Sequence, residues 1–322
     1  MNADSLLARF TVGYRDSEPR ALLDESGTLA LLDFSGHPAT SKDPRCLRVP
    51  LDAIAREPRE HWRVDAPVET GQHGALRWAA GGGWLFAALD VDEAAHGGIE
   101  TAAAHAYRNL CGFVAARTER HFLRLWNYLH AINQGEGDTE RYRRFCIGRA
   151  RGLGAHCMER YPAATAIGHR GPPGLLQVYA LCAAIPGGAL ENPRQVSAWR
   201  YPRDYGPTPP SFARAMRLPN HSLAISGTAA VVGHASRHGD DVVAQIDETF
   251  ANLDALLATA SLPVFDADSP LKIYLRRAQD ASKVEAALAR YLDPAVPRLL
   301  LSGDICRREL LVEIDGWSQP SH

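Results

Sequence analysis

The stretch "GIETAAAHAYRNLCGFVAARTERHFLRLWNYLHAIN" at residues 98–133 follows a plan that returns later in the chain. It predicts an amphipathic helix, a break, and then an apolar strand at "FLRLWNYL" (122–129). Residues 239–277, "GDDVVAQIDETFANLDALLATASLPVFDADSPLKIYLRR", have the same order of features. The sequence therefore indicates two copies of one structural unit.

Individual residues align between the two copies. Asn109 aligns with Asn252, and Tyr128 aligns with Tyr274 at nearly the same separation along the chain. The separation then shortens, because the first copy carries an insertion at residues 134–144, "QGEGDTERYRR". A chance match between two leucine-rich helices is the alternative. The order helix, strand, helix, strand, which is also preserved, favours the repeat.

The continuation of each copy completes the unit. "PAATAIGHRGPPGLLQVYA" (162–180) can be placed on "PRLLLSGDICRRELLVEID" (297–315). This pattern predicts an α+β fold with two lobes, each a mixed β-sheet with helices packed on one face. We expect a first lobe over residues 1–165 with a degenerate site, and a second lobe over residues 166–322 that carries the active site.

At two aligned positions the second copy has a charged residue where the first copy has an apolar one. In this overlay Glu313 is placed on Val178, and Arg298 is placed on Ala163. A carboxyl group on the apolar strand "LLVEI" is costly if it is buried and unpaired. We therefore predict that only the second lobe keeps a site, with Glu313 as acid or base and Arg298 as an anion clamp. The alternative is a glutamate on a half-exposed edge strand.

Two small residues are candidates for the same site. A hairpin through "RRE" would bring the Cys306 thiol and the Glu313 carboxyl to one cavity, where burial would raise the pKa of Glu313 so that it donates a proton near neutral pH. For Cys306 the alternative is a buried core thiol. Gly227 lies in the small-residue run "AISGTAAVVGHAS" (224–236), where it either makes room in a pocket or allows close packing of the sheet.

The segment "ENPRQVSAWRYPRDYGPTPPSFARA" (191–215) has neither helical nor strand periodicity. It combines arginines and aromatic residues with prolines, which lower the entropic cost of an ordered loop. Guanidinium groups bind carboxylates and aromatic rings pack on flat apolar surfaces, so the segment predicts a pocket for a small planar dianion. The alternative is a solvated interdomain linker, although linkers rarely carry this many aromatic residues.

The overall composition argues against several classes of protein. With 35 Lys+Arg and 37 Asp+Glu, the formal net charge is −2, so no global field attracts nucleic acid or an anionic membrane. We expect no membrane span, free thiols for the six cysteines, and a cytoplasmic location. His234 and His238 have helical spacing but no companion carboxylate, and no phosphate-binding glycine motif occurs, so neither a metal nor a nucleotide cofactor is expected.

Four blocks of the sequence resemble the chorismatase family and occur in the family's order. They are "WNYLHAINQGEGDTERYRRFCIGRARGL" (126–153), the segment 191–215, "ISGTAAVVGHAS" (225–236) and "SGDICRRELLVEIDG" (302–316). Enzymes of that family cleave chorismate, and their lobes are similar to the small RidA/YjgF fold. The resemblance thus implies two RidA/YjgF-like lobes with one working cleft, at the second lobe.

The resemblance also implies roles for individual residues. Glu313 would protonate the methylene carbon of the enolpyruvyl group so that pyruvate can leave. Cys306 and Gly227 indicate the branch that forms 3-hydroxybenzoate through an arene-oxide-type intermediate, because the hydrolysing subclass has alanine at both positions. Arg298 keeps the interval to Glu313 that RidA proteins show. The remaining substrate contacts implied by the resemblance are Arg149, Gln195, Tyr201 and Arg214.

Chorismate is therefore the expected partner, with no cofactor and with a monomer as the expected state. One subclass releases both 3- and 4-hydroxybenzoate, and these residues do not separate it from the others. The alternatives are a RidA-like imine deaminase, a small carboxylate-binding sensor, or a non-catalytic scaffold. The first two leave Cys306 and the loop 191–215 unexplained, and the third leaves Glu313 without a purpose.

Overall fold

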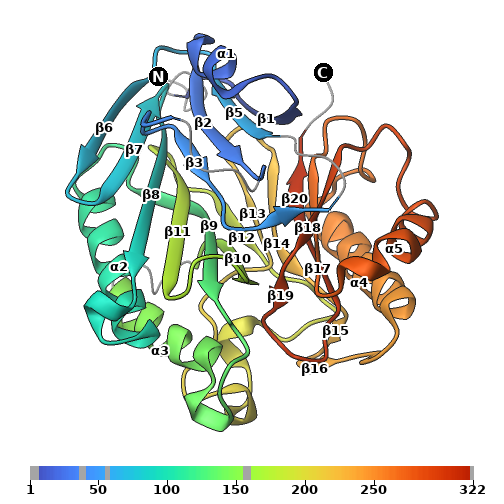
Figure 1. The fold of residues 1–322 in the computed structure, drawn as a ribbon. Helices are drawn as coiled ribbons and strands as arrows, with labels where there is room; N and C mark the ends of the chain where they lie inside the picture. Colours follow the sequence, from blue (N-terminus) through green and yellow to red (C-terminus); the bar gives the residue numbers. More distant parts are fainter. Residues whose placement is uncertain (1–6, 36–40, 55–58, 155–160, 320–322) are drawn as a thin grey trace.

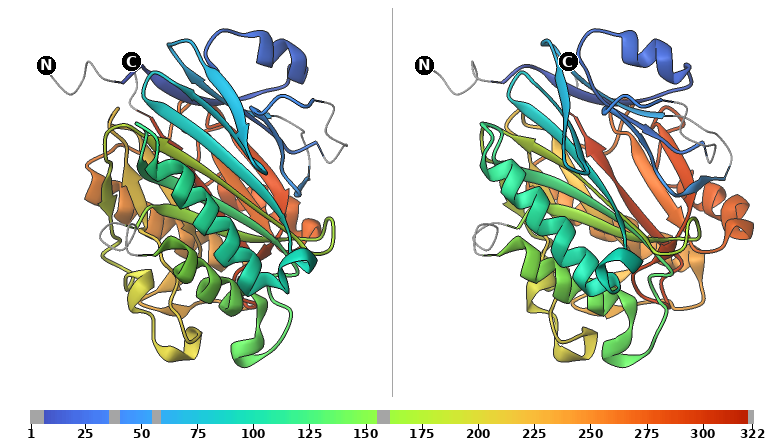
Figure 2. Two further views of the ribbon diagram at one scale, coloured as in Figure 1. Left: turned by 90° about the vertical axis from the view of Figure 1, so that its left-hand side faces the viewer. Right: turned by 60° about the vertical axis from the view of Figure 1, so that its left-hand side comes forward.

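Three larger β-sheets form the centre of the computed structural model, which describes residues 7–35, 41–54, 59–154 and 161–319. Two of these sheets have seven strands and one has four (Figure 1). Helices lie on the outer faces of the two large sheets, and the inner faces of all three sheets meet in a shared apolar core (Figure 2). The α+β fold with two helix-covered lobes is thus confirmed.

The first lobe is a mixed sheet covered by two helices. Its strands, from edge to edge, are β19 (Asp304–Ile305), β10 (Ala163–His169), β9 (His121–His130), β11 (Leu175–Ala183), β8 (Trp84–Asp92), β7 (Leu76–Gly81) and β6 (Glu69–His73). Helices α2 (Ile99–Ala115) and α3 (Arg141–Leu153) pack together and α2 covers the sheet. A Cβ atom on Gly148 would lie 2.0 Å from the Glu100 carbonyl oxygen, so only glycine lets α3 approach α2 this closely.

The second lobe repeats this arrangement. Its strands, in order, are β12 (Gly188–Leu190), β13 (Ala215–Arg217), β14 (Leu223–Thr228), β20 (Val312–Ser318), β17 (Leu271–Leu275), β18 (Arg298–Ser302) and β4 (Asp52–Ala53). Helices α4 (Val242–Ala260) and α5 (Ala281–Leu288) cover its outer face. In both lobes the strand after the long helix pairs in parallel with the next strand and antiparallel with the last, which confirms the repeat.

The N-terminal segment forms a sheet of its own, a feature that the sequence analysis assigned to the first lobe. The sheet contains β1 (Phe10–Arg15), β5 (Arg59–Val64), β2 (Thr28–Asp33) and β3 (Cys46–Arg48), and α1 (Pro19–Asp24) lies beside it. The expected boundary between the lobes at residues 165/166 falls inside β10, so it does not match the strand arrangement. Strands β10 and β11 are held by hydrogen bonds to β9 and β8, so the lobes span about residues 69–183 and 188–318.

The strand register also corrects the sequence overlay. Tyr128 lies opposite Gln177 in the first lobe, and Tyr274 lies opposite Glu313 in the second. Glu313 therefore corresponds to Gln177 and not to Val178. The connection after β18 is longer than the one after β10, so one offset cannot fit both strands. A slip of one residue moves a side chain to the opposite face of the sheet, which makes this correction important for function.

Large aromatic side chains fill the core shared by the three sheets. Trp62 of β5 lies 5.4 Å from Trp126 of β9 and 5.9 Å from Trp317 of β20, measured between ring centroids. The equivalent residues Tyr128 and Tyr274 touch, with their hydroxyl oxygens 3.2 Å apart. Burial of this apolar area is what holds the sheets together.

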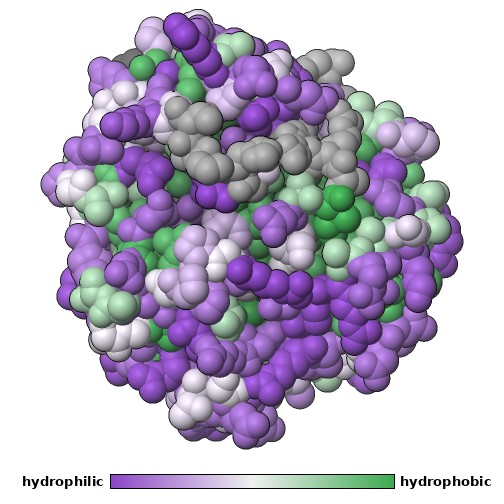
Figure 3. Space-filling model, viewed as in Figure 1, coloured by the Kyte–Doolittle hydropathy of each residue, from purple (hydrophilic) through white to green (hydrophobic). Residues whose placement is uncertain are grey.

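The outer surface shows few large apolar side chains. Among the described residues only Val264 and Tyr291 are large hydrophobic residues that stand exposed. The face seen in Figure 3 is mainly hydrophilic, with apolar residues in small separate patches. No described helix has the length and apolar character needed to cross a membrane.

Candidate active site

A cavity of about 410 Å³ lies at the seam between the two lobes. Four segments supply its walls: the start of α3 with the turn before it, the loop 191–215, the end of β14 with the following residues, and the stretch from β19 to β20. The residues that line it include Glu140, Tyr142, Arg143, Gln195, Tyr201, Tyr205, Phe212, Arg214, Gly227, Cys306, Arg307, Glu309 and Glu313.

Glu313 is the buried acid of this cavity. It lies on β20, which has β14 on one side and β17 on the other, so the alternative of an edge-strand glutamate is wrong. Glu313 is only 4% exposed, and no described residue forms a hydrogen bond with its carboxyl group. Burial, assisted by the negative charge of Asp315, raises the pKa of Glu313 to about 8. The carboxyl group is therefore mostly protonated at neutral pH.

Gly227 makes the space that the Glu313 carboxyl occupies. The pairing of β14 with β20 is irregular between Ile225 and Thr228, as in a β-bulge. A Cβ atom on Gly227 would lie 1.9 Å from Oε1 of Glu313. The structure thus favours the interpretation that this glycine makes room in a pocket.

Cys306 lines the same cavity but reaches it by a route that differs from the predicted hairpin. It directly follows β19, which pairs with β10 of the first lobe and not with β20. Burial, together with the negative charge of Glu313, raises the pKa of the Cys306 thiol to about 12, although Arg307 opposes this shift. Cys306 is therefore a neutral thiol beside the acid. Cys46 and Cys146 are also thiols, whereas Cys157 lies outside the described residues.

The loop 191–215 is a wall of the cavity, which supports the pocket interpretation over a linker. Gln195, Tyr201 and Arg214 all line the cavity, as predicted. Arg214 donates through Nη2 to the Val196 carbonyl oxygen and the Tyr201 hydroxyl, both at 2.7 Å. Its Nε atom is buried without a partner.

The other loop arginines serve the fold. Arg194 pairs with Glu248 at 2.5 Å, and Arg203 pairs with Asp138 at 2.5 Å. Arg200 is exposed and does not line the cavity. Arg214 is therefore the loop arginine that faces the cavity.

Arg307 is a second guanidinium of the cavity, and the sequence analysis missed it. Its guanidinium lies 4.1 Å from the ring centroid of Tyr205 and donates to the His234 carbonyl oxygen at 2.8 Å. Within the described part of the chain, neither Arg214 nor Arg307 forms an ion pair. The signal was present in the "CRRE" run, which was interpreted only as a turn.

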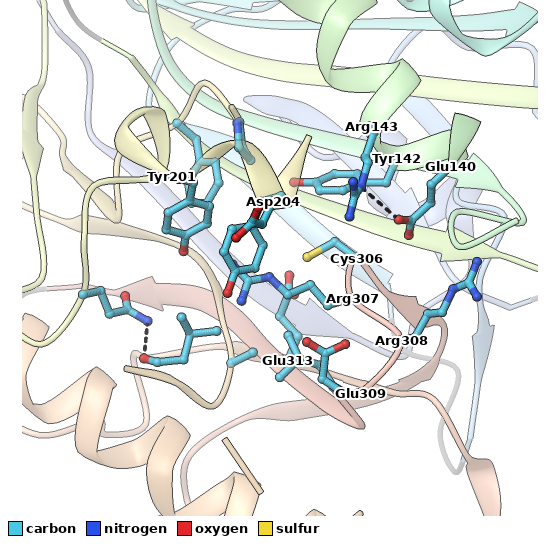
Figure 4. A pocket seen from close by; sticks show the side chains of 18 of the residues that line it. Glu140, Tyr142, Arg143, Tyr201, Asp204, Cys306, Arg307, Arg308, Glu309 and Glu313 are labelled. Atoms are coloured by element: carbon cyan, nitrogen blue, oxygen red, sulfur yellow. Dashed lines mark hydrogen bonds and ion pairs between the residues drawn. The ribbon is translucent and has the colours of Figure 1, made fainter. Parts of the chain in front are cut away.

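Three further residues come from the insertion in the first copy. Glu140, Tyr142 and Arg143 approach the cavity from the first lobe, whereas Arg307 and Glu313 approach it from the second (Figure 4). Arg143 pairs with Glu140 at 3.3 Å. The insertion at residues 134–144 was the available signal, because added residues at the edge of a repeat often build a site.

Two predicted contacts do not line the cavity. Arg298 lies on the helix-facing side of β18 and pairs with Glu285 of α5 at 3.1 Å, so the structure does not bring it to Glu313. Arg149 is buried on α3 and donates to the Ser211 carbonyl oxygen at 2.8 Å. It therefore supports the loop wall from behind.

The two histidines considered as metal ligands have other contacts. His234 Nδ1 lies 3.3 Å from the Tyr205 hydroxyl, and His238 Nε2 lies 3.3 Å from a carboxylate oxygen of Glu248. In the described ranges no group of three or more His, Cys, Asp or Glu residues is placed to hold a metal ion.

A buried carboxyl group with a raised pKa that faces a cavity lined by guanidinium groups without an ion pair to any described residue is the arrangement of a general-acid enzyme for a small anion. Comparisons with known proteins agree with this class and narrow it. The chain belongs to the chorismatase family. The family model described as "Chorismatase FkbO/Hyg5-like, N-terminal" matches residues 60–182, a range that ends one residue before the end of β11.

Similar proteins extend this match over most of the chain. A chorismatase of Streptomyces rapamycinicus is 33% identical over 303 residues, which cover 88% of this chain and 89% of the relative. A 3-hydroxybenzoate synthase of Streptomyces hygroscopicus is 32% identical, covering 84% of each chain. The crystal structure of a chorismatase superposes with a TM-score of 0.84 at 31% identity, covering 97% of this chain and 98% of that one.

Proposed function

We propose that this protein cleaves chorismate to pyruvate and 3-hydroxybenzoate, formed either alone or together with 4-hydroxybenzoate. The observation that carries the proposal is the position of the Glu313 carboxyl group, which is buried at the cavity and forms no hydrogen bond with any described residue. Burial raises its pKa to about 8, so it can donate a proton near neutral pH. Relatives named chorismatase and 3-hydroxybenzoate synthase support the choice of substrate.

The cavity complements the charge and shape of chorismate. The substrate carries two carboxylates, and Arg214 and Arg307 present two guanidinium groups that no described carboxylate neutralises. Either guanidinium can bind either carboxylate, and the two together match the double negative charge of the substrate.

Aromatic side chains complete the substrate site. The rings of Tyr201, Tyr205 and Phe212 line the cavity, so they can pack against the flat ring of the substrate. Tyr201 also accepts a hydrogen bond from Arg214, which fixes the orientation of both groups before substrate binds. Preorganisation of this kind reduces the cost of binding.

The first chemical step is proton transfer from Glu313 to the methylene carbon of the enolpyruvyl group. The resulting oxocarbenium ion weakens the bond between the ether oxygen and the ring. The family resemblance implies that the substrate's own ring hydroxyl displaces pyruvate intramolecularly: its oxygen bonds to the ring carbon as the ether bond to that carbon breaks, which forms an arene oxide. The hydroxyl proton returns to the Glu313 carboxylate, so the acid is regenerated and no water is consumed.

The second step is collapse of the arene oxide to the aromatic product. Cys306 keeps its proton in this site, so it acts as a neutral hydrogen-bond donor or acid toward the epoxide oxygen and not as a thiolate nucleophile. Gly227 leaves the acid and the reacting ring the space they need. Both residues belong to the aromatising pattern that the resemblance implies.

The proposal is tested by incubating the purified protein with chorismate, without added metal or nucleotide. Pyruvate is measured enzymatically and the aromatic products are separated by chromatography. We expect equal amounts of pyruvate and hydroxybenzoate, and the ratio of 3- to 4-hydroxybenzoate follows from the same run. Absence of pyruvate release would contradict the proposal.

The product branch is tested with Cys306→Ala. We expect chorismate consumption to continue while the product shifts toward the non-aromatic dihydroxy-cyclohexadiene carboxylate, because the thiol acts only after pyruvate leaves. Chromatography of the product mixture gives the readout. Cys46→Ala, which removes a buried thiol in the N-terminal sheet, is the matched control. An unchanged product profile in Cys306→Ala would show that the thiol is only a core residue.

A further inference from the structure

A buried network of charges lies where the three sheets meet, next to the catalytic acid. Arg124 of β9 pairs with Asp315 of β20 at 3.0 Å, and both side chains are fully buried. Lys272 of β17 pairs with Glu60 of β5 at 2.6 Å and lies 3.6 Å from Asp315. Asp315 and Glu313 are two residues apart on one strand, so their side chains share its inner face.

Asp315 is the centre of this network. One of its carboxylate oxygens, Oδ2, accepts hydrogen bonds from Arg124 Nη2 (3.0 Å), Trp126 Nε1 (3.0 Å), Thr165 Oγ1 (2.7 Å) and the Tyr274 hydroxyl (2.9 Å). Charge-assisted hydrogen bonds of this number hold a carboxylate in one position. The negative charge is thus fixed at a buried position that does not line the cavity.

Stability alone does not explain the network. Replacing a buried ion pair by apolar residues of similar size is often neutral or stabilising, because the desolvation of two charges is costly. The first lobe has uncharged residues at the equivalent strand positions: Tyr179 corresponds to Asp315, and Gln177 corresponds to Glu313. The two carboxyl groups occur together, in the lobe whose strand faces the cavity.

We propose that Asp315 is a positioning residue whose buried charge keeps the Glu313 carboxyl protonated between catalytic cycles. This inference rests on the proposed role of Glu313 as the acid. Ionisation of Glu313 would place a second negative charge near Asp315 in a poorly hydrated region, where like charges repel strongly.

Several groups on the surrounding elements influence the same proton. Burial is the largest cause of the raised pKa of Glu313, and Asp315 is the next; the charges of Arg124, Arg214 and Arg276 act in the opposite direction. Neutral groups around Glu313 include the Cys306 thiol and the Tyr142 hydroxyl, and Tyr274 lies opposite it on β17. Asp315 is the carboxylate among the leading causes, so its removal changes the balance most directly.

The test compares the protonation of Glu313 in charge variants of the network. The midpoint is measured by ¹³C NMR of protein labelled at glutamate side-chain carboxyls, with the Glu313 signal assigned by its loss in Glu313→Gln. The pH dependence of kcat/KM for chorismate is measured in parallel. For Asp315→Asn we expect both midpoints to fall by about one pH unit or more, so that the rate near pH 9 drops about tenfold below that of the wild type.

A second variant gives the opposite sign. Arg124→Gln removes a positive charge that favours the ionised acid, so the midpoint should rise. Thr165→Val is the matched control, because it removes a hydrogen bond to Asp315 without changing any charge, and its midpoint should stay within about 0.3 of the wild type. A structural role alone would lower the melting temperature and the rate at every pH without moving the midpoint.

The outcomes separate this inference from the proposed function. A folded Asp315→Asn protein with an unchanged NMR midpoint would overturn the role of Asp315, even if chorismate is still cleaved. If that variant does not fold, an Arg124→Gln midpoint that fails to rise would have the same consequence. If the NMR midpoints move as expected but no variant cleaves chorismate, the proposed function fails and the electrostatic coupling stands.

Discussion

The same strand position holds Gln177 in the first lobe and Glu313 in the second, and the surroundings of the two side chains differ more than the residues do. Gln177 donates through Nε2 to the Arg48 carbonyl oxygen at 2.9 Å and to Asp90 at 2.8 Å. The N-terminal segment thus occupies the place where a cavity would be. Glu313 lines the cavity, and no residue in the described part of the chain forms a hydrogen bond with its carboxyl group. A buried polar side chain is available for reaction when neighbouring protein groups do not occupy it with hydrogen bonds.

The strand beside each position shows how the cavity arose. β8 pairs with β11 without interruption from Trp84 to Asp92. The equivalent pairing of β14 with β20 is broken by the irregularity that contains Gly227. An extra residue in one strand bends it away from its neighbour, and a glycine at that point removes the side chain that would fill the gap. In the second lobe the sheet is therefore irregular next to Glu313, which leaves space for the cavity.

The largest expected effect comes from the acid itself. Glu313→Gln keeps the size of the side chain but removes the transferable proton, so kcat/KM for pyruvate release should fall about 10²–10⁴-fold. Gln177→Met, at the equivalent position of the first lobe, is the control and should change the rate less than about threefold. Both are measured with a coupled pyruvate assay. If the two variants lose activity equally, the functional difference between the lobes is refuted.

The next effect concerns the irregular strand. Gly227→Ala places a methyl group where the Glu313 carboxyl now lies, since the added Cβ would be 1.9 Å from Oε1. The carboxyl must move, and a displacement of this size at a reacting group should lower kcat about 10–100-fold. Gly112→Ala on α2 is the control, because its added Cβ meets no atom within 4 Å. A Gly227→Ala enzyme with unchanged kcat would show that the carboxyl position is not critical.

Much of this comparison could be predicted from the sequence. Helical and strand periodicity revealed the repeat, and the contrast of charge between the copies pointed to Glu313. The register could not be predicted, because it depends on hydrogen bonds between β11 and β9 and on a longer connection after β18. Arg307 escaped notice because its contacts with Tyr205 and His234 join segments that are distant in the sequence. The N-terminal sheet was missed because its core is shared with both lobes.

A third test measures the stability of the fold. Burial of the ionisable Glu313 makes the free energy of unfolding depend on pH, whereas the uncharged Gln177 has no such effect. The pKa of Glu313 rises from 4.5, its ordinary value, to about 8 in the folded protein. Between these values the folded state binds up to one more proton than the unfolded state, so this group lowers the free energy of unfolding as pH increases, by at most about 1.4 kcal/mol per pH unit. Glu313→Gln removes this loss, so its stability relative to the wild type should increase from pH 5 to pH 8.

Urea denaturation at the two pH values gives the measurement. Glu309→Gln is the matched control, because Glu309 also lines the cavity but is exposed. Its stability relative to the wild type should depend little on pH. If the difference between Glu313→Gln and the wild type stays constant between pH 5 and pH 8, Glu313 is not held protonated by the fold.

The smallest expected effect is at Arg298, and it separates the sequence overlay from the observed register. Arg298 lies opposite Leu271, whose side chain belongs to the core between the second sheet and its helices, and it pairs with Glu285 on the surface of α5. Strand alternation therefore directs it away from the inner face that carries Glu313. Arg298→Ala should change kcat/KM less than about twofold, because exposed ion pairs contribute little and the cavity is unaffected. Arg214→Ala, measured in the same assay, should raise KM strongly because it removes a guanidinium that lines the cavity. A large loss of activity in Arg298→Ala would mean that the second lobe binds its substrate on the face that the helices cover, and the assignment of the cavity would have to be abandoned.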